Sequence, residues 1–181
     1  LALDFILILT MLMIYQYMKY REYQGEIDFL TGVMGRRLFL QHCQNIQSDQ
    51  RIHGHQGWFL FLDVDWFKQI NDKLGHIAGD ETLKKFAMFL KEQFEPYGAV
   101  GRVGGDEFAV MIEEEMSQEA LEEEMKQFFQ NISGIQKEVT VSCSIGVYRF
   151  KYPKTIKELL TKTDEILYEA KANGRGCFVI R

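Results

Sequence analysis

The sequence predicts an α/β (α+β) fold in which a central, mostly antiparallel sheet is flanked by helices. Its 181 residues are enough for one domain and a short appendage. Trp58 to Val64 is a nearly continuous apolar run of strand length, as expected for a buried central strand. Two β-rich runs are separated by Gly104-Gly105, and this pattern predicts a tight hairpin.

The remaining elements follow from the spacing of apolar residues and from the glycine positions. Leu83, Phe86 and Leu90, for example, share one face of a helix. In chain order we expect a helix over 36–47, the strand 58–64, a short helix over 67–74 that Gly75 ends, a longer helix that starts near Asp80, hairpin strands over 99–103 and 106–112, an acidic helix over 113–129, a strand over 139–147, a helix over 156–172 and a closing strand over 177–180. The order β-α-β-β-α-β within 58–147 is the split βαβ, ferredoxin-like arrangement.

Residues 1–27 are expected to form an N-terminal helix ahead of a domain over 28–181. Leu1 to Ile14 is almost entirely apolar, and tyrosines alternate with basic residues over 15–21. This order is typical of the cytoplasmic exit of a membrane helix, but a span needs about 20 apolar residues. We therefore expect the end of a transmembrane helix that anchors a cytoplasmic domain to the inner face of the membrane. The alternative is a soluble signalling helix or half of a dimeric coiled coil.

The composition argues against several classes of protein. The net charge of -5 and the pI near 5.4 disfavour non-specific nucleic-acid binding, which needs a basic face. Any negatively charged ligand must therefore be held by local Lys or Arg side chains, backbone N–H groups or a metal. Cys43, Cys143 and Cys177 are far apart and lack CxxC spacing, so neither a disulfide framework nor a zinc site is predicted.

Two acidic clusters interrupt the apolar strands. Asp63 and Asp65 end the first core strand, where alternation directs both side chains to the same side of the sheet. Asp106 and Glu107 follow the Gly-Gly turn. In a βαββ unit the first strand lies beside the hairpin, so Asp63 and Asp106 are expected to meet. Converging carboxylates suit Mg²⁺, although either cluster alone is equally compatible with a solvated acidic turn.

Arg102 to Phe108 reads RVGGDEF, and this run resembles the RxGGDEF signature of GGDEF domains. Four further blocks resemble the family's motifs in the right order: DxLTG at 28–32, DxDxFKxINDxxGHxxGD at 63–80, SIGV at 144–147 and YxAKxxGR at 168–175. The resemblance covers residues 28–181. A five-residue match alone is weak evidence, but five ordered blocks are specific.

The resemblance implies a diguanylate cyclase that condenses two GTP into cyclic di-GMP and two pyrophosphates. It further implies a requirement for Mg²⁺ (or Mn²⁺) and a two-fold homodimer, because one domain supplies half of the reaction centre. A sensor or membrane segment ahead of this sequence would control the pairing, and no nucleic acid takes part. The alternative is a catalytically inactive GGDEF domain that binds GTP or cyclic di-GMP as a regulatory module. Such relatives usually lose one of the acids, whereas Asp63, Asp106 and Glu107 are all present here.

The family's site residues transfer onto matching positions of this sequence. The resemblance implies metal binding by Asp63, Asp106, Glu107 and the carbonyl of Val64, catalysis by Asp106, Glu107 and Lys68, room for the nucleotide at Gly104 and Gly105, phosphate contacts from Lys68, Lys171 and Arg175, and guanine recognition by Asn71 and Asp80. Without the resemblance, Lys171 and Arg175 are ordinary cations at a helix C-terminus. Asp80 is likewise interpretable as a helix N-cap.

One stretch departs from relatives that are inhibited by their product. Those relatives carry an RxxD motif just upstream of the hairpin, where this sequence reads Glu95-Pro96-Tyr97-Gly98. Neither the arginine nor the aspartate is present. We therefore expect no high-affinity inhibitory site for cyclic di-GMP.

Overall fold

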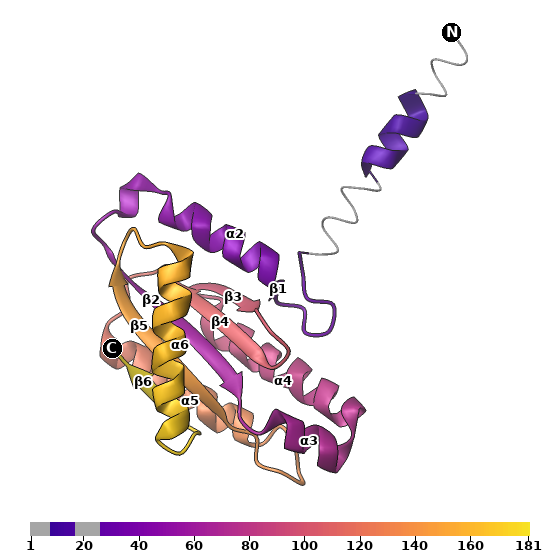
Figure 1. The fold of residues 1–181 in the computed structure, drawn as a ribbon, viewed down its shortest axis with the longest axis vertical. Coiled ribbons are helices and arrows are strands. Elements are labelled where there is room, and N and C mark those ends of the chain that lie inside the picture. Colours follow the sequence, from indigo (N-terminus) through magenta and orange to yellow (C-terminus); the bar gives the residue numbers. More distant parts are fainter. Residues whose placement is uncertain (1–7, 17–25) are drawn as a thin grey trace.

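A computed structural model describes residues 8–16 and 26–181 of the protein. Its elements are β1 (Met34–Gly35), α2 (Arg36–Gln47), the 3-10 turn η1 (Gln50–Ile52), β2 (Gln56–Val64), α3 (Phe67–Leu74), α4 (His76–Phe94), β3 (Gly98–Arg102), β4 (Glu107–Ile112), α5 (Gln118–Ser133), β5 (Cys143–Lys151), α6 (Ile156–Ala172) and β6 (Phe178–Ile180), as drawn in Figure 1. Residues 8–16 are also helical, and apolar side chains such as Met11 and Met13 are exposed there.

The strands form a six-stranded mixed sheet in the order β1-β3-β4-β2-β5-β6. The four inner strands are antiparallel, whereas the edge strands β1 and β6 pair in parallel with β3 and β5. The inner order β3-β4-β2-β5 is that of a ferredoxin-like βαββαβ core, so the predicted fold class is confirmed. The central strand β2 pairs along its length with both β4 and β5.

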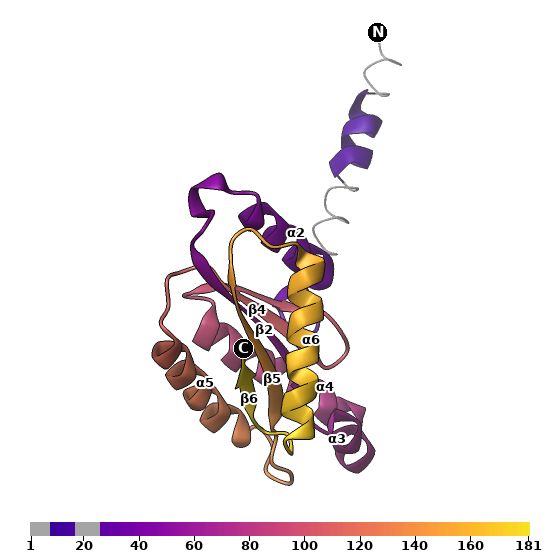
Figure 2. The same cartoon turned by 60° about the vertical axis from the view of Figure 1, so that its left-hand side comes forward.

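Helices cover both faces of the sheet. α2 and α6 lie on one face, and α4 and α5 lie on the other (Figures 1 and 2). Side chains of β2 alternate between these two layers, as the pleat requires. Trp58, Leu60 and Leu62 pack in the core under α4 and α5. Phe59 and Phe61 pack in the core under α2 and α6. Two-sided burial explains why the strand reads as a continuous apolar run.

Helix α6 lies directly against the sheet because Gly146 has no side chain. A Cβ atom at Gly146 would lie 2.3 Å from the Thr163 carbonyl oxygen and 2.5 Å from the Leu167 nitrogen. Both are backbone atoms of α6 and have little freedom to move. The close approach therefore fixes the height of α6 above β5, and with it the position of the residues that follow the helix.

The helices over 36–47, 67–74 and 156–172 begin and end as predicted. The prediction for the longer helix was wrong at its start: α4 begins at His76, because Gly75 ends α3 and, at φ 86°, serves as the N-cap of α4. The acidic helix starts later than predicted, at Gln118, where the Ser117 hydroxyl accepts from the Ala120 N–H at 3.2 Å. The strand predicted over 139–147 runs instead over 143–151.

Residues 1–7 and 17–25 of the predicted N-terminal helix lie outside the described residues. Within 8–16 and 26–181, no helix has both the length and the apolar character needed to cross a bilayer.

The contact at Gly146 gives a stability prediction. Gly146→Ala should lower the free energy of unfolding by about 1–3 kcal/mol, because the methyl group forces α6 away from β5. Gly134→Ala is the matched control, since a Cβ there meets no atom within 4 Å and φ is -94°. Urea unfolding followed by circular dichroism measures both variants. Equal stability of the two variants would contradict the close packing described above.

Candidate active site

The acidic residues of two motifs meet at one end of β2. The register pairs Asp63 of β2 with Glu107 of β4. The backbone N–H of Val64 donates to the carbonyl oxygen of Asp106 at 3.1 Å. The hairpin therefore lies beside the end of the first core strand, as the sequence predicted. Three carboxylates, those of Asp63, Asp106 and Glu107, are close enough to influence one another's ionisation.

Burial and mutual repulsion both disfavour the charged forms of these acids. Burial raises the pKa of Asp63, and the neighbouring charges of Asp106 and Asp65 raise it further, against the opposing effect of Lys171. Burial also raises the pKa of Glu107, and the charges of Asp63 and Asp106 add to this shift. A cation placed among these carboxylates would therefore be bound favourably.

Lys171 reaches this acidic cluster from the end of α6. Its Nζ atom lies 2.9 Å from Oδ2 of Asp63, and both side chains are largely shielded from solvent. The close packing of α6 on β5 at Gly146 brings the last turn of the helix to this point. Lys171 is thus more than a cation at a helix terminus: it pairs with an acid of the cluster.

Asp65 has a different environment from Asp63, although the sequence grouped the two. Its carboxylate is buried and accepts hydrogen bonds from the Ser142 hydroxyl (2.9 Å), the Ser144 hydroxyl (2.7 Å) and the Gly176 backbone N–H (2.9 Å). These bonds join the end of β2 to β5 and to the loop after α6. Because both Asp65 oxygens accept hydrogen bonds within the protein, Asp65 has a structural role. The acidic cluster consists of Asp63, Asp106 and Glu107.

The hairpin loop is held by Arg102, a role that the sequence analysis did not assign. The Arg102 guanidinium donates to the Gly105 carbonyl at 3.2 Å and 2.6 Å, and to Oδ1 of Asp28 at 2.9 Å. Asp28 also accepts from the Thr31 N–H and hydroxyl. Burial alone would raise the pKa of Asp28, but these hydrogen bonds outweigh it and hold the pKa below its usual value. Arg102 therefore connects the hairpin loop to the segment around Asp28, which lies 74 residues earlier in the chain.

The two hairpin glycines have different surroundings. A Cβ at Gly104 would lie 2.1 Å from Oε2 of Glu107, whereas a Cβ at Gly105 would meet nothing within 4 Å. Gly104 therefore leaves room for the Glu107 carboxylate, and Gly105 leaves open space above the turn.

The predicted guanine-recognition residues lie on the pair of helices α3 and α4. A Cβ at Gly79 would lie 1.9 Å from Oδ1 of Asn71, so the Asn71 side chain rests against the backbone just before Asp80. Asp80 is exposed and lies inside α4, which begins at His76. The interpretation of Asp80 as a helix N-cap is therefore wrong.

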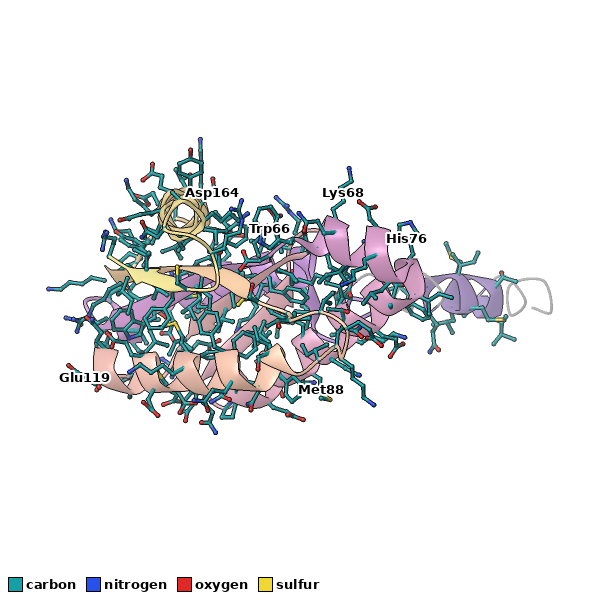
Figure 3. The ribbon with its side chains drawn as sticks, turned by 90° about the horizontal axis from the view of Figure 1, so that it is seen from below. Trp66, Lys68, His76, Met88, Glu119 and Asp164 are labelled. Atoms are coloured by element: carbon teal, nitrogen blue, oxygen red, sulfur yellow. The ribbon has the colours of Figure 1, made fainter. Side chains whose placement is uncertain are left out.

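Trp66 lies between the helices that carry the predicted phosphate-contacting cations. Figure 3 shows Trp66 between Asp164 on α6 and Lys68 on α3, on the side of the sheet away from Met88 and Glu119. Lys68 is exposed in the first turn of α3. The guanidinium of Arg175, which follows α6, stacks over the Trp66 ring at 4.2 Å from its centroid.

The stretch that replaces RxxD lies beside further acidic residues, Glu113 and Glu114, in the folded structure. Glu95, Tyr97 and Gly98 line a cavity of about 300 Å³ together with Glu113 and its neighbours. His42 Nε2 lies 2.6 Å from Oε1 of Glu113. A Cβ at Gly98 would lie 1.9 Å from the backbone carbonyl oxygen of Met111, which belongs to the paired strand β4.

The chain is similar in sequence and fold to several known proteins. Diguanylate cyclase DgcS of Shewanella oneidensis is 33% identical over 164 residues, which are 89% of this chain and 55% of DgcS. The chain thus spans about half of that relative. The solved GGDEF domain of TpbB (YfiN) from Pseudomonas aeruginosa superposes with a TM-score of 0.71 at 32% identity, covering 85% of this chain and 93% of that one.

A structure of the coiled coil and GGDEF domain of DgcB from Caulobacter crescentus has a TM-score of 0.83 and covers 100% of both chains. At 19% identity this similarity concerns the fold alone. The family described as "Diguanylate cyclase, GGDEF domain" matches residues 26–177. The chain belongs to the GGDEF family of diguanylate cyclase domains.

Proposed function

We propose that this chain is the catalytic domain of a diguanylate cyclase, which converts two GTP into cyclic di-GMP and two pyrophosphates. The observation that carries the proposal is the meeting of Asp63, Asp106 and Glu107 at one end of β2, with Lys171 paired to Asp63 at 2.9 Å. Inactive GGDEF relatives that only bind nucleotides usually lack one of these acids. The complete set favours catalysis.

The acidic cluster fits a metal ion that binds together with the nucleotide. Within residues 8–16 and 26–181, no three His, Cys, Asp or Glu side chains are arranged to hold a metal on their own. Mg²⁺ usually takes one or two carboxylates and completes its shell with substrate phosphates and water. We assign Asp63, Asp106, Glu107 and the Val64 carbonyl to Mg²⁺ (or Mn²⁺). When bound, this metal would offset the triphosphate charge and make the 3′-hydroxyl a better nucleophile.

The chain's own groups would then act on the substrate as follows. Asp106 and Glu107 lie together in the acidic cluster, and we assign both to catalysis with Lys68, since their carboxylates would hold the metal beside the reacting 3′-hydroxyl. Lys171 would exchange its contact with Asp63 for the leaving phosphates, joined by Arg175 and Lys68. Gly105 would let the nucleotide approach the backbone of the hairpin, where nothing lies within 4 Å of its Cβ position.

Guanine recognition is assigned to Asn71 and Asp80. A carboxylate at Asp80 can accept the N1–H and N2–H groups of guanine, and adenine lacks this pair of donors. The Asn71 amide is held against Gly79, one residue before Asp80, which supports a joint role for the two side chains.

The reaction would need two copies of the chain. Each copy offers one acidic cluster, whereas cyclic di-GMP contains two phosphodiester bonds that are formed between two GTP molecules. We propose a two-fold homodimer, in which each GTP supplies the 3′-oxygen that attacks the α-phosphorus of the other. Residues 8–16 form a helix with exposed apolar side chains, which suits either a coiled coil or the end of a membrane anchor. In this proposal, residues 1–27 control the pairing of the domains over 28–181, at the inner face of the membrane.

Removing one acid should abolish product formation without unfolding the domain. Asp63→Asn or Asp106→Asn keeps the shape but removes a negative charge, so we expect at least a roughly 100-fold lower rate of cyclic di-GMP formation from GTP and Mg²⁺. Glu165→Gln, which removes an exposed carboxylate on α6 paired with Lys162, is the control and should keep the parental rate. Chromatography with mass detection identifies the product. Parental rates in either aspartate variant would refute the metal assignment, and an inactive parent that binds GTP would favour the regulatory module.

Base selectivity should depend on Asp80. Asp80→Ser should weaken discrimination against ATP by about 1–3 kcal/mol, or roughly 5- to 150-fold, the usual value of a hydrogen bond to a charged group. Glu81→Ser, on the adjacent exposed position of α4, should leave selectivity unchanged. Competition between GTP and ATP in one mixture measures the ratio. An unchanged ratio in Asp80→Ser would remove this residue from guanine recognition.

Cyclic di-GMP should not inhibit this domain from the stretch 95–98. Glu95, Glu113 and Glu114 line the cavity at this stretch, and its described lining residues include no arginine that could bind the product's phosphates; Glu95 pairs with Lys91, and Glu113 pairs with His42. Glu95→Arg alone should not create the inhibitory site, because the motif also needs an aspartate at position 98. Any side chain at Gly98 would clash with the Met111 carbonyl oxygen, which lies 1.9 Å from the Cβ position. Initial rates at saturating GTP, with added cyclic di-GMP, measure the effect. Non-competitive inhibition at low product concentration in the parent protein would contradict the prediction.

A further inference from the structure

Two residues with unusual backbone conformations meet beside the acidic cluster. Among residues 8–16 and 26–181, the non-glycine residues with positive φ are Trp66 (57°) and Arg175 (65°). Such conformations cost free energy for bulky residues and persist only where the surrounding structure fixes them. These two residues contact each other, since the Arg175 Cζ atom lies 4.2 Å from the centroid of the Trp66 ring.

The buried carboxylate of Asp65 holds both residues in place. Asp65 directly precedes Trp66, and its Oδ2 accepts the backbone N–H of Gly176, which directly follows Arg175, at 2.9 Å. The other bonds to Asp65 come from Ser144 of β5 and from Ser142, which lies just before that strand. The Asp65 carboxylate therefore fixes the distance between the backbone at Trp66 and the backbone at Arg175. The strained conformations direct the indole and the guanidinium toward each other.

Packing in the core does not explain an indole at this place. The Trp66 side chain is 55% exposed, whereas the other tryptophan, Trp58, is 2% exposed. The contact that Trp66 makes is with the Arg175 guanidinium, whose Cζ atom lies over the indole ring at 4.2 Å from its centroid. The Arg175 Nε atom lies 4.0 Å from Oδ1 of Asp65, a distance too long for a hydrogen bond. The described neighbours of this guanidinium are therefore the Trp66 ring, through a cation–π contact, and the Asp65 carboxylate at a longer ion-pair distance.

Stacking leaves the hydrogen-bond donors of an arginine available. A cation–π contact is made between the positive charge of the guanidinium and the face of the ring, and it needs no hydrogen-bond acceptor. A carboxylate partner would occupy the N–H groups of the guanidinium. An indole therefore orients Arg175 without competing with a phosphate ligand.

We infer that Trp66 is a positioning residue that orients the Arg175 guanidinium for the β- and γ-phosphates of GTP. The inference rests on the proposed function, because it concerns the triphosphate of that substrate. Trp66 lies between α6 and α3 (Figure 3), and these elements also carry Lys171 and Lys68. In the proposed function, Arg175 held over Trp66 would bind the triphosphate together with these two lysines.

The test separates the indole from the backbone conformation. Trp66→Asn removes the ring but keeps a residue that tolerates positive φ, and Trp66→Phe retains an aromatic face. Binding of a non-hydrolysable GTP analogue with Mg²⁺ is measured by calorimetry. Trp66→Asn should weaken binding about 2- to 30-fold, as the loss of a cation–π contact implies, and Trp66→Phe should recover most of it. In turnover assays KM should rise and kcat should stay within about twofold, because the contact is made before and during the reaction.

Two controls make the result specific. Met88→Ala, on the opposite side of the molecule, should leave binding unchanged. In an Arg175→Asn background, the change Trp66→Asn should have no further effect, because its partner is already absent. Binding should also change the fluorescence of the exposed Trp66, and this change should be missing in Trp66→Phe, which retains the buried Trp58.

The outcomes distinguish the inference from the proposed function. Equal affinity of Trp66→Asn and the parent protein, or additive losses in the double variant, would overturn the positioning role and leave the proposed cyclase intact. A parent protein that does not bind the GTP analogue would overturn both.

Discussion

The pairing of β2 with β4 on one side and β5 on the other determines where the acidic residues of the candidate site lie. This register places Asp63 opposite Glu107 on β4 and opposite Ser144 on β5. A shift of one residue would move each of these side chains to the other face of the sheet. Packing on both faces of β2 opposes such a shift, because Trp58, Leu60 and Leu62 would leave the core under α4 and α5 for the layer in which Phe59 and Phe61 pack.

Two aspartates that are two residues apart have opposite tasks because their surroundings differ. The Asp65 carboxylate is buried and saturated by three donors, so it joins β2, β5 and the loop after α6 into one rigid frame. The Asp63 carboxylate has Lys171 as its partner and other acids as neighbours. The first arrangement stabilises a charge within the protein. The second leaves charge to be neutralised by a ligand, which is the property that a metal and triphosphate site requires.

The distribution of charge shows how a negatively charged protein could bind the negatively charged substrate that we propose. Cations gather at the end of α6 and around α3, where Lys171 pairs with Asp63 and Arg175 stacks on Trp66. The acids of the stretch around Glu95 and Glu113 line a separate cavity. Local arrangement, rather than net charge, therefore decides which surface attracts phosphate.

The sequence by itself determined the fold class, the helices over 36–47, 67–74 and 156–172, the hairpin and the family, because these depend on local periodicity and ordered motifs. It did not place the start of α4 at His76, since apolar spacing does not show that Gly75 ends one helix and starts the next. Only the tertiary structure showed that Asp65 and Asp63 have different surroundings, and that Arg102 forms an ion pair with Asp28. The contact of Trp66 with Arg175 is of the same kind. Such contacts link residues far apart in the chain, and their existence depends on how the packed sheet and helices bring those residues together.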